Sequence, residues 1–221
     1  MGPSGEGKTT LIGMFLGLIH PQSGQAVMSA AGGMEVVLNA ETSHLFAYVP
    51  QGNTILSGTI AENLRMVKED ATEEEMIEAL EIACAWDFVK KRPDTINSNV
   101  GERGRGLSEG QAQRLSIARA IAKQPEIYIF DDSFSALDFK TDAALRKALK
   151  EETEEATHLI VAQRISTIIH ADQILVLDDG KIVGKGTHEE LLKNCDVYMQ
   201  IAQSQLSAKE LGIDDNKKEG M

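Results

Sequence analysis

Cysteine, basic residues and long apolar runs are all scarce in this 221-residue chain. Its two cysteines, Cys84 and Cys195, stand far apart without metal-site spacing, so each is predicted to be a free buried thiol. The formal net charge of −12 argues against a nucleic-acid surface, which needs clustered Lys and Arg. No apolar run approaches the ~18 residues of a membrane-spanning helix, and the glycine-rich start lacks a signal-peptide pattern. These features indicate an ordinary globular protein, long enough for one substantial core or for a core with an inserted subdomain.

Apolar periodicity switches between strand and helix along the chain. One helix at 9–19 and three short strands are expected before residue 52, and the stretch 55–122 has the period of helices. Within that stretch, Thr72 and Glu75 have the spacing of a capping box. Strand and helix patterns then alternate at 127–130, 140–152, 158–163, 166–171, 173–186 and 187–194. This alternation predicts an α/β layer with a mostly parallel sheet, into which the helical stretch is inserted.

The first residues form a glycine-rich phosphate-binding pattern. The stretch GPSGEGKT, residues 2–9, matches G-x-x-x-x-G-K-S/T, in which backbone N–H groups turn inward on phosphate oxygens. Lys8 supplies a point charge for the β- and γ-phosphates and Thr9 supplies a magnesium ligand, while the following helix aims its N-terminus at the same anion. A strand should precede this pattern, and only Met1 does so here. We therefore expect a nucleotide triphosphate site in a chain that begins in the middle of a fold.

The stretch IYIFDD, residues 127–132, ends an apolar strand in two adjacent carboxylates. The strand is expected to deliver Asp131 to a magnesium ion, directly or through water, as phosphoryl-transfer sites require. Alone the pattern is weak, because many strands end in Asp at a turn. Together with an upstream phosphate loop it becomes a specific signal for a magnesium-nucleotide site.

A third pattern, LSEGQ at residues 107–111, points to a family when it is combined with the other two. It resembles the signature sequence of the ATP-binding cassette transporters. YVPQGNTILSGTIAENL, residues 48–64, resembles the glutamine loop of their exporter-type members, and SALD resembles the loop after the magnesium-binding strand. The resemblance extends from Gly2 to about Gln205. It implies an α/β P-loop NTPase (RecA-like) core with a mostly parallel sheet and an inserted α-helical subdomain, with the usual N-terminal strands missing.

The resemblance also implies how the chain divides. Residues 1–53 and 121–195 would form the ATP-binding core, and residues 54–120 the helical subdomain with the signature. Residues 196–221 would form a C-terminal helix and a polar tail, expected to be disordered over 212–221.

Each residue that matches a family motif is implied to have the corresponding role. Asp131 and Thr9 would serve magnesium, and Gln51 would reach the magnesium and the attacking water while relaying motion to a membrane domain. The triphosphate would be bound by Gly2, Pro3, Ser4, Gly5, Glu6, Gly7, Lys8, Thr9 and Thr10. In a head-to-tail dimer, the nucleotide of a second subunit would be contacted by the signature residues Leu107, Ser108, Glu109, Gly110 and Gln111, with the Glu109 side chain toward solvent. The loop after the magnesium-binding strand is formed by Ser135, Ala136, Leu137 and Asp138.

Two positions depart from the family pattern. The family usually has Glu after the magnesium-binding Asp, to polarise the hydrolytic water, and Asp132 is one methylene shorter. Its switch strand usually carries a His that contacts the γ-phosphate, and Gln163 stands there. A displacement of ~1 Å can cost ~10²-fold in rate, and Gln carries neither the proton nor the charge of an imidazole. A site with the catalytic residues Asp132, Gln163 and Gln51 is therefore expected to hydrolyse ATP poorly, as in the degenerate half of heterodimeric exporters. We expect the chain to bind ATP rather than to turn it over efficiently.

The cofactors implied by the resemblance are ATP and Mg²⁺. The implied partners are a second cassette subunit, in a heterodimer, and the transmembrane domain of an exporter at the cytoplasmic side of the plasma membrane, with no nucleic acid. The stretch NVGERG, residues 99–104, resembles the loop that touches the membrane domain. Two other interpretations stay open: a non-functional truncated fragment of such a subunit, and a soluble cassette protein acting on DNA or ribosomes. The acidic charge and the exporter-like ILSGTIAENL oppose the second of these.

Overall fold

The computed structural model describes residues 1–3, 5–29, 33, 35–52 and 54–207. These residues divide into two compact units, which we call the terminal unit (residues 1–11 and 161–207) and the central unit (residues 12–160). The tail predicted over 212–221 lies outside the described residues. The predicted division into core, helical subdomain and C-terminal segment uses other boundaries and stays a prediction.

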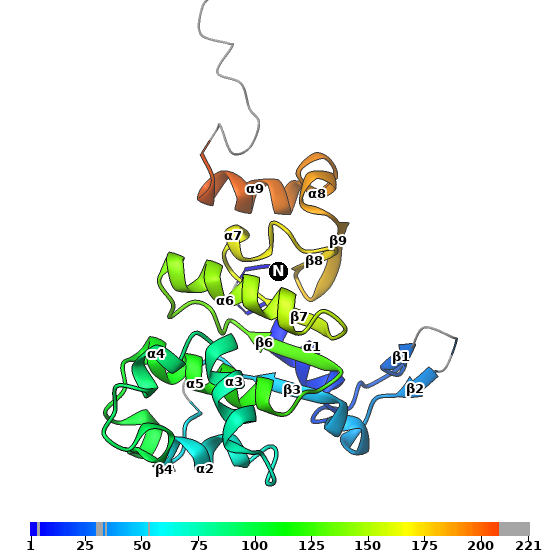
Figure 1. Ribbon diagram of the computed structural model, residues 1–221. Coiled ribbons are helices and arrows are strands. Elements are labelled where there is room, and N and C mark those ends of the chain that lie inside the picture. Colours follow the sequence, from blue (N-terminus) through cyan, green and yellow to red (C-terminus); the bar gives the residue numbers. More distant parts are fainter. Residues whose placement is uncertain (4, 30–32, 34, 53, 208–221) are drawn as a thin grey trace, which may run out of the picture. The chain divides into compact units, whose positions relative to one another are not determined.

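A three-stranded sheet with the order β3, β6, β7 lies at the centre of the central unit (Figure 1). Strand β3 (Phe46–Val49) runs parallel to β6 (Ile127–Asp131), and β7 (Thr157–Val161) lies on the other side of β6. In β6, Ile129 and Phe130 are fully buried, as expected for a parallel strand covered on both faces. The structure thus confirms the predicted α/β layer with parallel strands.

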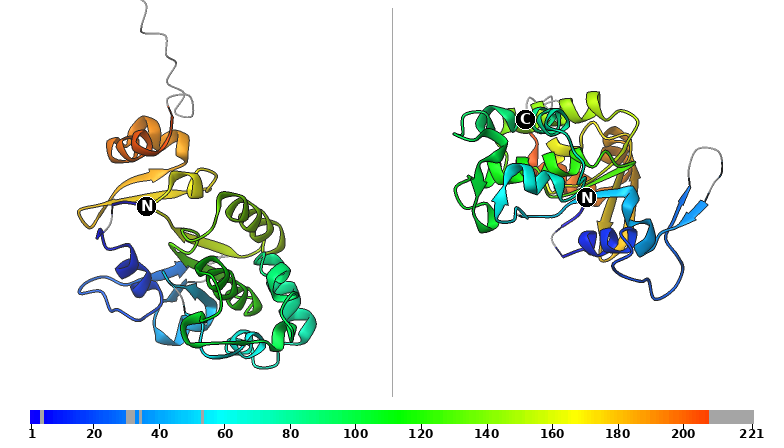
Figure 2. Two further views of the ribbon diagram at one scale, coloured as in Figure 1. Left: turned by 90° about the vertical axis from the view of Figure 1, so that its left-hand side faces the viewer. Right: turned by 60° about the horizontal axis from the view of Figure 1, so that its bottom comes forward.

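The stretch predicted to be helical folds into four helices that gather at one end of the central unit (Figures 1 and 2). Their bounds are α2 (Ile60–Arg65), α3 (Glu73–Ile82), α4 (Trp86–Val89) and α5 (Glu109–Ala122). Helix α5 packs against α2, α3 and β3, and its buried Leu115 and Ile117 belong to the same core cluster as Met76 and Leu80 of α3. The predicted capping box is present at α3, where Thr72 Oγ1 accepts from the Glu75 N–H and Glu75 Oε2 accepts from the Thr72 N–H.

Short elements interrupt and flank these helices. Strands β4 (Gly58–Thr59) and β5 (Asn99–Val100) pair antiparallel inside the stretch 55–122, whose apolar period predicted helices. Two of the three short strands expected before residue 52 are β1 (Val27–Ser29) and β2 (Glu35–Val37), which pair antiparallel and project away from the rest of the central unit (Figures 1 and 2). Helix α6 (Phe139–Glu152) follows β6. Three 3₁₀ turns lie at Ala40–Leu45, Thr95–Asn97 and Glu102–Gly104.

Helix α1 (Lys8–Phe15) is shorter than the predicted 9–19. Gly17 adopts the left-handed region with φ +68°, and the N–H groups of Leu18 and Ile19 both donate to the Gly13 carbonyl, at 2.8 and 3.0 Å. A left-handed glycine that turns the following N–H groups back onto the last turn is a common way to end a helix. The apolar residues after it extended the helical pattern in the sequence but not the helix.

The described residues of the terminal unit include the start of α1, an antiparallel pair of strands and three further helices. Strands β8 (Ile174–Asp178) and β9 (Lys181–Gly186) form an antiparallel hairpin within the predicted stretch 173–186. The helices are α7 (Ile165–Ile168), α8 (His188–Asn194) and α9 (Asp196–Gln205). Met1 pairs with β8, since its amine donates to the Leu175 carbonyl at 2.6 Å and its carbonyl accepts from the Leu177 N–H at 2.7 Å. The residue before the phosphate loop therefore has the strand-like pairing that the motif requires.

Two expectations drawn from the scarcities of the sequence can be compared with the structure. Both cysteines are free; Cys195 is buried and Cys84 is only half-buried. Within the described part of the chain, none of the helices combines the length and apolar character needed to cross a membrane.

The end of α1 provides a test of the packing. A Cβ added at Gly17 would lie 2.2 Å from the Asn39 carbonyl carbon and 2.4 Å from the Ala40 nitrogen, whereas one at Gly24 (φ +78°) would meet nothing within 4 Å. Either change places an alanine in a left-handed backbone conformation, which costs ~1–2 kcal/mol. Only Gly17→Ala adds a clash with the backbone, which costs a further ~1–3 kcal/mol. We expect Gly17→Ala to lower the free energy of unfolding in urea by ~3 kcal/mol and Gly24→Ala by ~1 kcal/mol. Equal losses would contradict this packing.

Candidate nucleotide-binding site

The predicted phosphate loop lies in the terminal unit and leads directly into α1 at Lys8. Gly5 and Gly7 have φ values of +92° and +84°, in the left-handed region that side chains rarely adopt. The Lys8 ammonium donates to the Gly2 carbonyl at 2.8 Å and to the Pro3 carbonyl. The Lys8 ammonium, which is predicted to bind phosphate, thus hydrogen-bonds to carbonyl groups of its own loop. Phosphate oxygens could replace these two acceptors. Ser4 lies outside the described residues.

In the terminal unit, one contact supports the phosphate loop and another supports the backbone at Gln163, the predicted switch residue. The sequence analysis predicted neither contact. The N–H of Gly180, in the turn between β8 and β9, donates to Glu6 Oε2 at 3.3 Å. Gln205 of α9 donates through Nε2 to the Gln163 carbonyl and accepts through Oε1 from the Ile165 N–H, both at 2.8 Å. The backbone around Gln163 is thus held by the C-terminal helix.

In the central unit, three hydrogen bonds join the end of β3 to the end of β6. Tyr48 donates through its hydroxyl to Asp131 Oδ2 at 3.3 Å, and Gln51 donates through Nε2 to Asp132 Oδ2 at 3.3 Å. Between them, the buried Ser133 hydroxyl donates to the Val49 carbonyl at 2.8 Å. Gln51, Asp131 and Asp132, which the sequence predicts to act together, are therefore brought together at the carboxyl ends of two parallel strands.

The two adjacent carboxylates have different environments. Asp131 is 3% exposed, whereas Asp132 is partly exposed and has a left-handed backbone with φ +50°. Asp is one of the few residue types that tolerate this conformation. The Asp132 carbonyl also accepts from the Ser135 hydroxyl at 2.8 Å, which fastens the start of the SALD loop. The strand thus delivers the first carboxylate into the interior and turns sharply at the second.

The signature residues form the N-terminus of α5. Ser108 and Gln111 make a reciprocal capping box, with Ser108 Oγ accepting from the Gln111 N–H at 3.2 Å and Gln111 Oε1 accepting from the Ser108 N–H at 3.0 Å. Glu109 is exposed, as expected. A Cβ on Gly110 would lie 3.1 Å from the Ala136 carbonyl oxygen, so the signature packs closely on the SALD loop.

The SALD loop has a structural role that the sequence motif alone does not indicate. Leu137 is buried, and Asp138 caps α6 by accepting from the Thr141 N–H at 3.0 Å and from the Thr141 hydroxyl at 2.7 Å. These two hydrogen bonds, the one from the hydroxyl first, lower the pKa of Asp138. The spacing of Asp138 and Thr141 ahead of an amphipathic stretch was the available signal.

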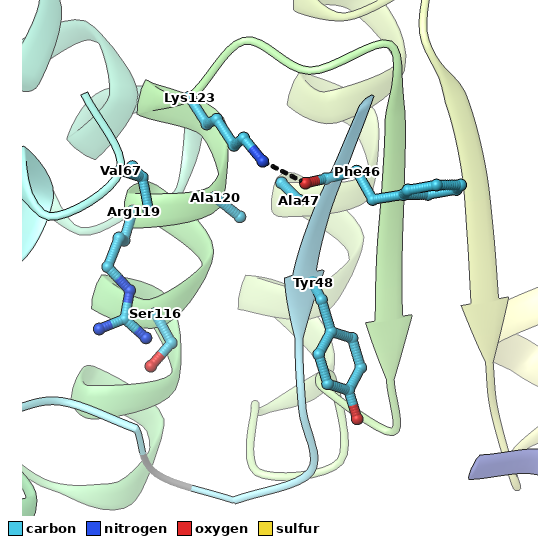
Figure 3. A pocket seen from close by; sticks show the side chains of 8 residues that line it. All are labelled: Phe46, Ala47, Tyr48, Val67, Ser116, Arg119, Ala120 and Lys123. Carbon is cyan, nitrogen blue, oxygen red and sulfur yellow. Dashed lines mark hydrogen bonds between the residues drawn. The ribbon is translucent and has the colours of Figure 1, made fainter. Parts of the chain in front are cut away.

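A small hollow borders β3 on the side of α5 and is lined by charged as well as apolar side chains (Figure 3). Lys123 donates to the Phe46 carbonyl at 2.5 Å, and Arg119 donates to the Thr54 carbonyl at 3.1 Å and to the Thr54 hydroxyl at 2.6 Å. Burial lowers the pKa of both basic groups. Helix α5 is thereby bonded to both ends of the segment that carries Gln51.

The bond from Ser133 to Val49 gives a second test. Ser133 is 1% exposed, so Ser133→Ala leaves the Val49 carbonyl without this donor at a buried strand end. We expect a loss of ~1–2 kcal/mol in the free energy of unfolding. Ser135→Ala removes an exposed hydroxyl two residues away, whose bond to the Asp132 carbonyl water can replace, and should cost less than ~0.5 kcal/mol. Urea denaturation of the two variants checks the difference, and a harmless Ser133→Ala would show that this bond does not hold the strand ends.

Comparison with known proteins places these features in a family. A family model described as ABC transporter matches residues 1–135. An uncharacterized ABC transporter ATP-binding protein of Mycobacterium tuberculosis is 42% identical over 220 residues, which cover 96% of this chain and 37% of that protein. A β-(1→2)glucan export ATP-binding/permease protein of Agrobacterium vitis is 40% identical over 191 residues, covering 86% of this chain and 32% of that protein.

A solved structure agrees with these sequence matches. The structure of a bacterial Atm1-family ABC exporter with ATP bound matches with a TM-score of 0.85 and 32% sequence identity, over 93% of this chain and 36% of that one. The chain thus spans about a third of the length of the relatives that it matches. It belongs to the ABC transporter family and has the P-loop NTPase fold of that family's nucleotide-binding domains.

Proposed function

We propose that the chain binds ATP with Mg²⁺ and is the nucleotide-binding part of an exporter. The observation that carries this proposal is the cluster of Gln51, Asp131 and Asp132 at the carboxyl ends of β3 and β6. Ligands of α/β proteins bind at the carboxyl ends of parallel strands. An ATP site also needs groups that hold the triphosphate. The glycines of the phosphate loop and Lys8 have the residue types and spacing for this role.

The residues assigned to magnesium fit that ion chemically. Asp131 offers a carboxylate, Thr9 a hydroxyl and Gln51 an amide oxygen, and Mg²⁺ prefers oxygen ligands of this kind. When bound, Mg²⁺ would neutralise charge on the β- and γ-phosphate oxygens. Lys8 would contribute its positive charge to the same phosphates, and Gln51 would orient the water that attacks them.

Hydrolysis at this site is proposed to be slow. Asp132 is one methylene shorter than the usual Glu and is held by Gln51 at 3.3 Å. A general base must come within hydrogen-bond reach of its water, and a short side chain on a sharply turned backbone is a poor candidate. Gln163, in place of the usual His, offers only a neutral amide to the γ-phosphate. Both departures weaken chemistry rather than binding.

The proposed partners follow from the same family resemblance. A second cassette subunit would face residues 107–111 in a head-to-tail heterodimer, and its nucleotide would meet the exposed Ser108 at the start of α5. A transmembrane domain would contact the chain near residues 99–104, and the chain would lie at the cytoplasmic side of the plasma membrane. The relative from Agrobacterium vitis is described as an export ATP-binding/permease protein, and that description supports export as the process served.

Nucleotide binding is tested by thermal unfolding with and without millimolar MgATP. A ligand at ~100 times its Kd stabilises the folded state by ~2.7 kcal/mol, so we expect a clear rise in melting temperature. Lys8→Ala should abolish this rise, because it removes the charge that meets the phosphates. Lys185→Ala, an exposed lysine of β9, makes the same change in net charge and should leave the rise intact. No rise in the unsubstituted chain would favour the interpretation as a non-functional fragment.

Impaired hydrolysis is tested by restoring the usual residues. The double variant D132E/Q163H should release phosphate from MgATP at least ~10-fold faster than the unsubstituted chain, because a general base contributes ~10²–10⁴-fold when correctly placed. Each single variant should gain less than the pair. The Lys8→Ala change added to the double variant serves as the blank. An unchanged rate would mean that these two positions do not limit the reaction.

A further inference from the structure

We propose that Tyr48 is a positioning residue for the magnesium site, which it serves by fixing the orientation of the Asp131 carboxylate. This inference rests on the proposed MgATP site. Its starting point is the hydrogen bond from the Tyr48 hydroxyl to Asp131 Oδ2, at 3.3 Å. Neither the nucleotide-binding motifs nor the roles assigned above include this phenol.

The register of the sheet explains why these two side chains meet. Tyr48 of β3 lies opposite Ile129 of β6 in the parallel pair. Side chains two residues apart along a strand point to the same face, so Asp131 projects on the same face as Ile129 and one step beyond it. The long phenol of Tyr48 can therefore reach forward along the sheet to the carboxylate. The adjacent bond from Ser133 to Val49 holds the two strand ends at this spacing.

The phenol is a neutral donor at physiological pH. A tyrosine hydroxyl ordinarily loses its proton only near pH 10, so this group is protonated at neutral pH. A protonated hydroxyl that donates to one carboxylate oxygen restricts rotation of the carboxylate. Groups that hydrogen-bond a metal-binding carboxylate orient it toward the ion, and their loss typically costs ~10–100-fold in metal affinity or activity.

A second tyrosine offers a matched comparison. Tyr128 lies on β6 itself, is 2% exposed, and has its pKa raised to about 12 by burial alone. It stacks on Phe130 with ring centroids 6.0 Å apart, and among the described residues its hydroxyl has no hydrogen bond to Asp131. The two phenols therefore differ in the contact that matters, although both are protonated and both belong to the same sheet.

The experiment titrates Mg²⁺ into the chain with a fluorescent ATP analogue and repeats the nucleotide titration in EDTA. For Tyr48→Phe we expect an increase of ~10-fold in the Mg²⁺ concentration at half-maximal response, with the nucleotide Kd in EDTA unchanged within twofold. Tyr128→Phe should leave both quantities unchanged. In an Asp131→Asn background, Tyr48→Phe should have no further effect on the Mg²⁺ response. Tyr48→Leu, which removes the ring as well, should shift the Mg²⁺ response as much as Tyr48→Phe does.

Each other outcome has a defined meaning. A Mg²⁺ response of Tyr48→Phe within twofold of the unsubstituted chain would overturn the positioning role while the MgATP site stands. Equal weakening in EDTA and in Mg²⁺ would also overturn it, because a purely structural effect does not depend on the metal. If the unsubstituted chain binds the nucleotide without any response to Mg²⁺, the proposed metal site fails and the role of Tyr48 fails with it.

Discussion

The parallel pairing of β3 with β6 is the constraint on which the central unit depends. Its register sets Phe46 to Val49 against Ile127 to Phe130, and both strands end at the same edge of the sheet. One residue of slip would turn every side chain of a strand to the opposite face. The buried β6 resists such a slip because its apolar side chains, including Phe130, are enclosed by the core. Packing far from the polar edge thus determines which side chains meet there.

At this edge of the sheet, Asp131 and Asp132 are adjacent in the sequence but lie in different environments. Asp131 completes the regular strand and is enclosed, with a phenol as donor. Asp132 begins the turn, is partly exposed and meets a flexible amide instead. An enclosed carboxylate suits an ion that stays in place during a reaction, whereas a water-activating group must lie where water can enter. The proposed roles of Asp131 and Asp132 match this distinction, although the Asp132 side chain is short.

Much of this arrangement could be predicted from the sequence. The strand and helix patterns located most elements, and the capping box at Thr72 was predicted from local spacing. The box that the structure shows at Ser108 has the same spacing. The meeting of Gln51 with Asp132 was expected only because the family resemblance joined two distant motifs. The end of α1 was placed too late, because apolar residues continue past Gly17 and periodicity does not record backbone handedness.

What could not be predicted depends on contacts between distant segments. The bonds from Tyr48 to Asp131 and from Ser133 to Val49 follow from sheet register, which no single strand encodes. The pairing of β4 with β5 joins two-residue strands that have no detectable alternation. Likewise, the helix pattern around Arg119 indicates only a polar position. It does not indicate that the partner of Arg119 is Thr54, which lies 65 residues earlier in the chain.

The clamp from Arg119 to Thr54 has a mechanical consequence for Gln51. The segment around Gln51 is anchored to the sheet at Val49, through Ser133, and to helix α5 at Thr54, through Arg119. Five residue steps separate these anchors, so the segment can extend to at most ~17 Å. The segment is therefore short. A displacement of α5 away from the sheet would pull Gln51 away from Asp132 once the segment is fully extended. The same helix begins at the signature residues, so α5 connects the segment around Gln51 to the residues proposed to face a second subunit.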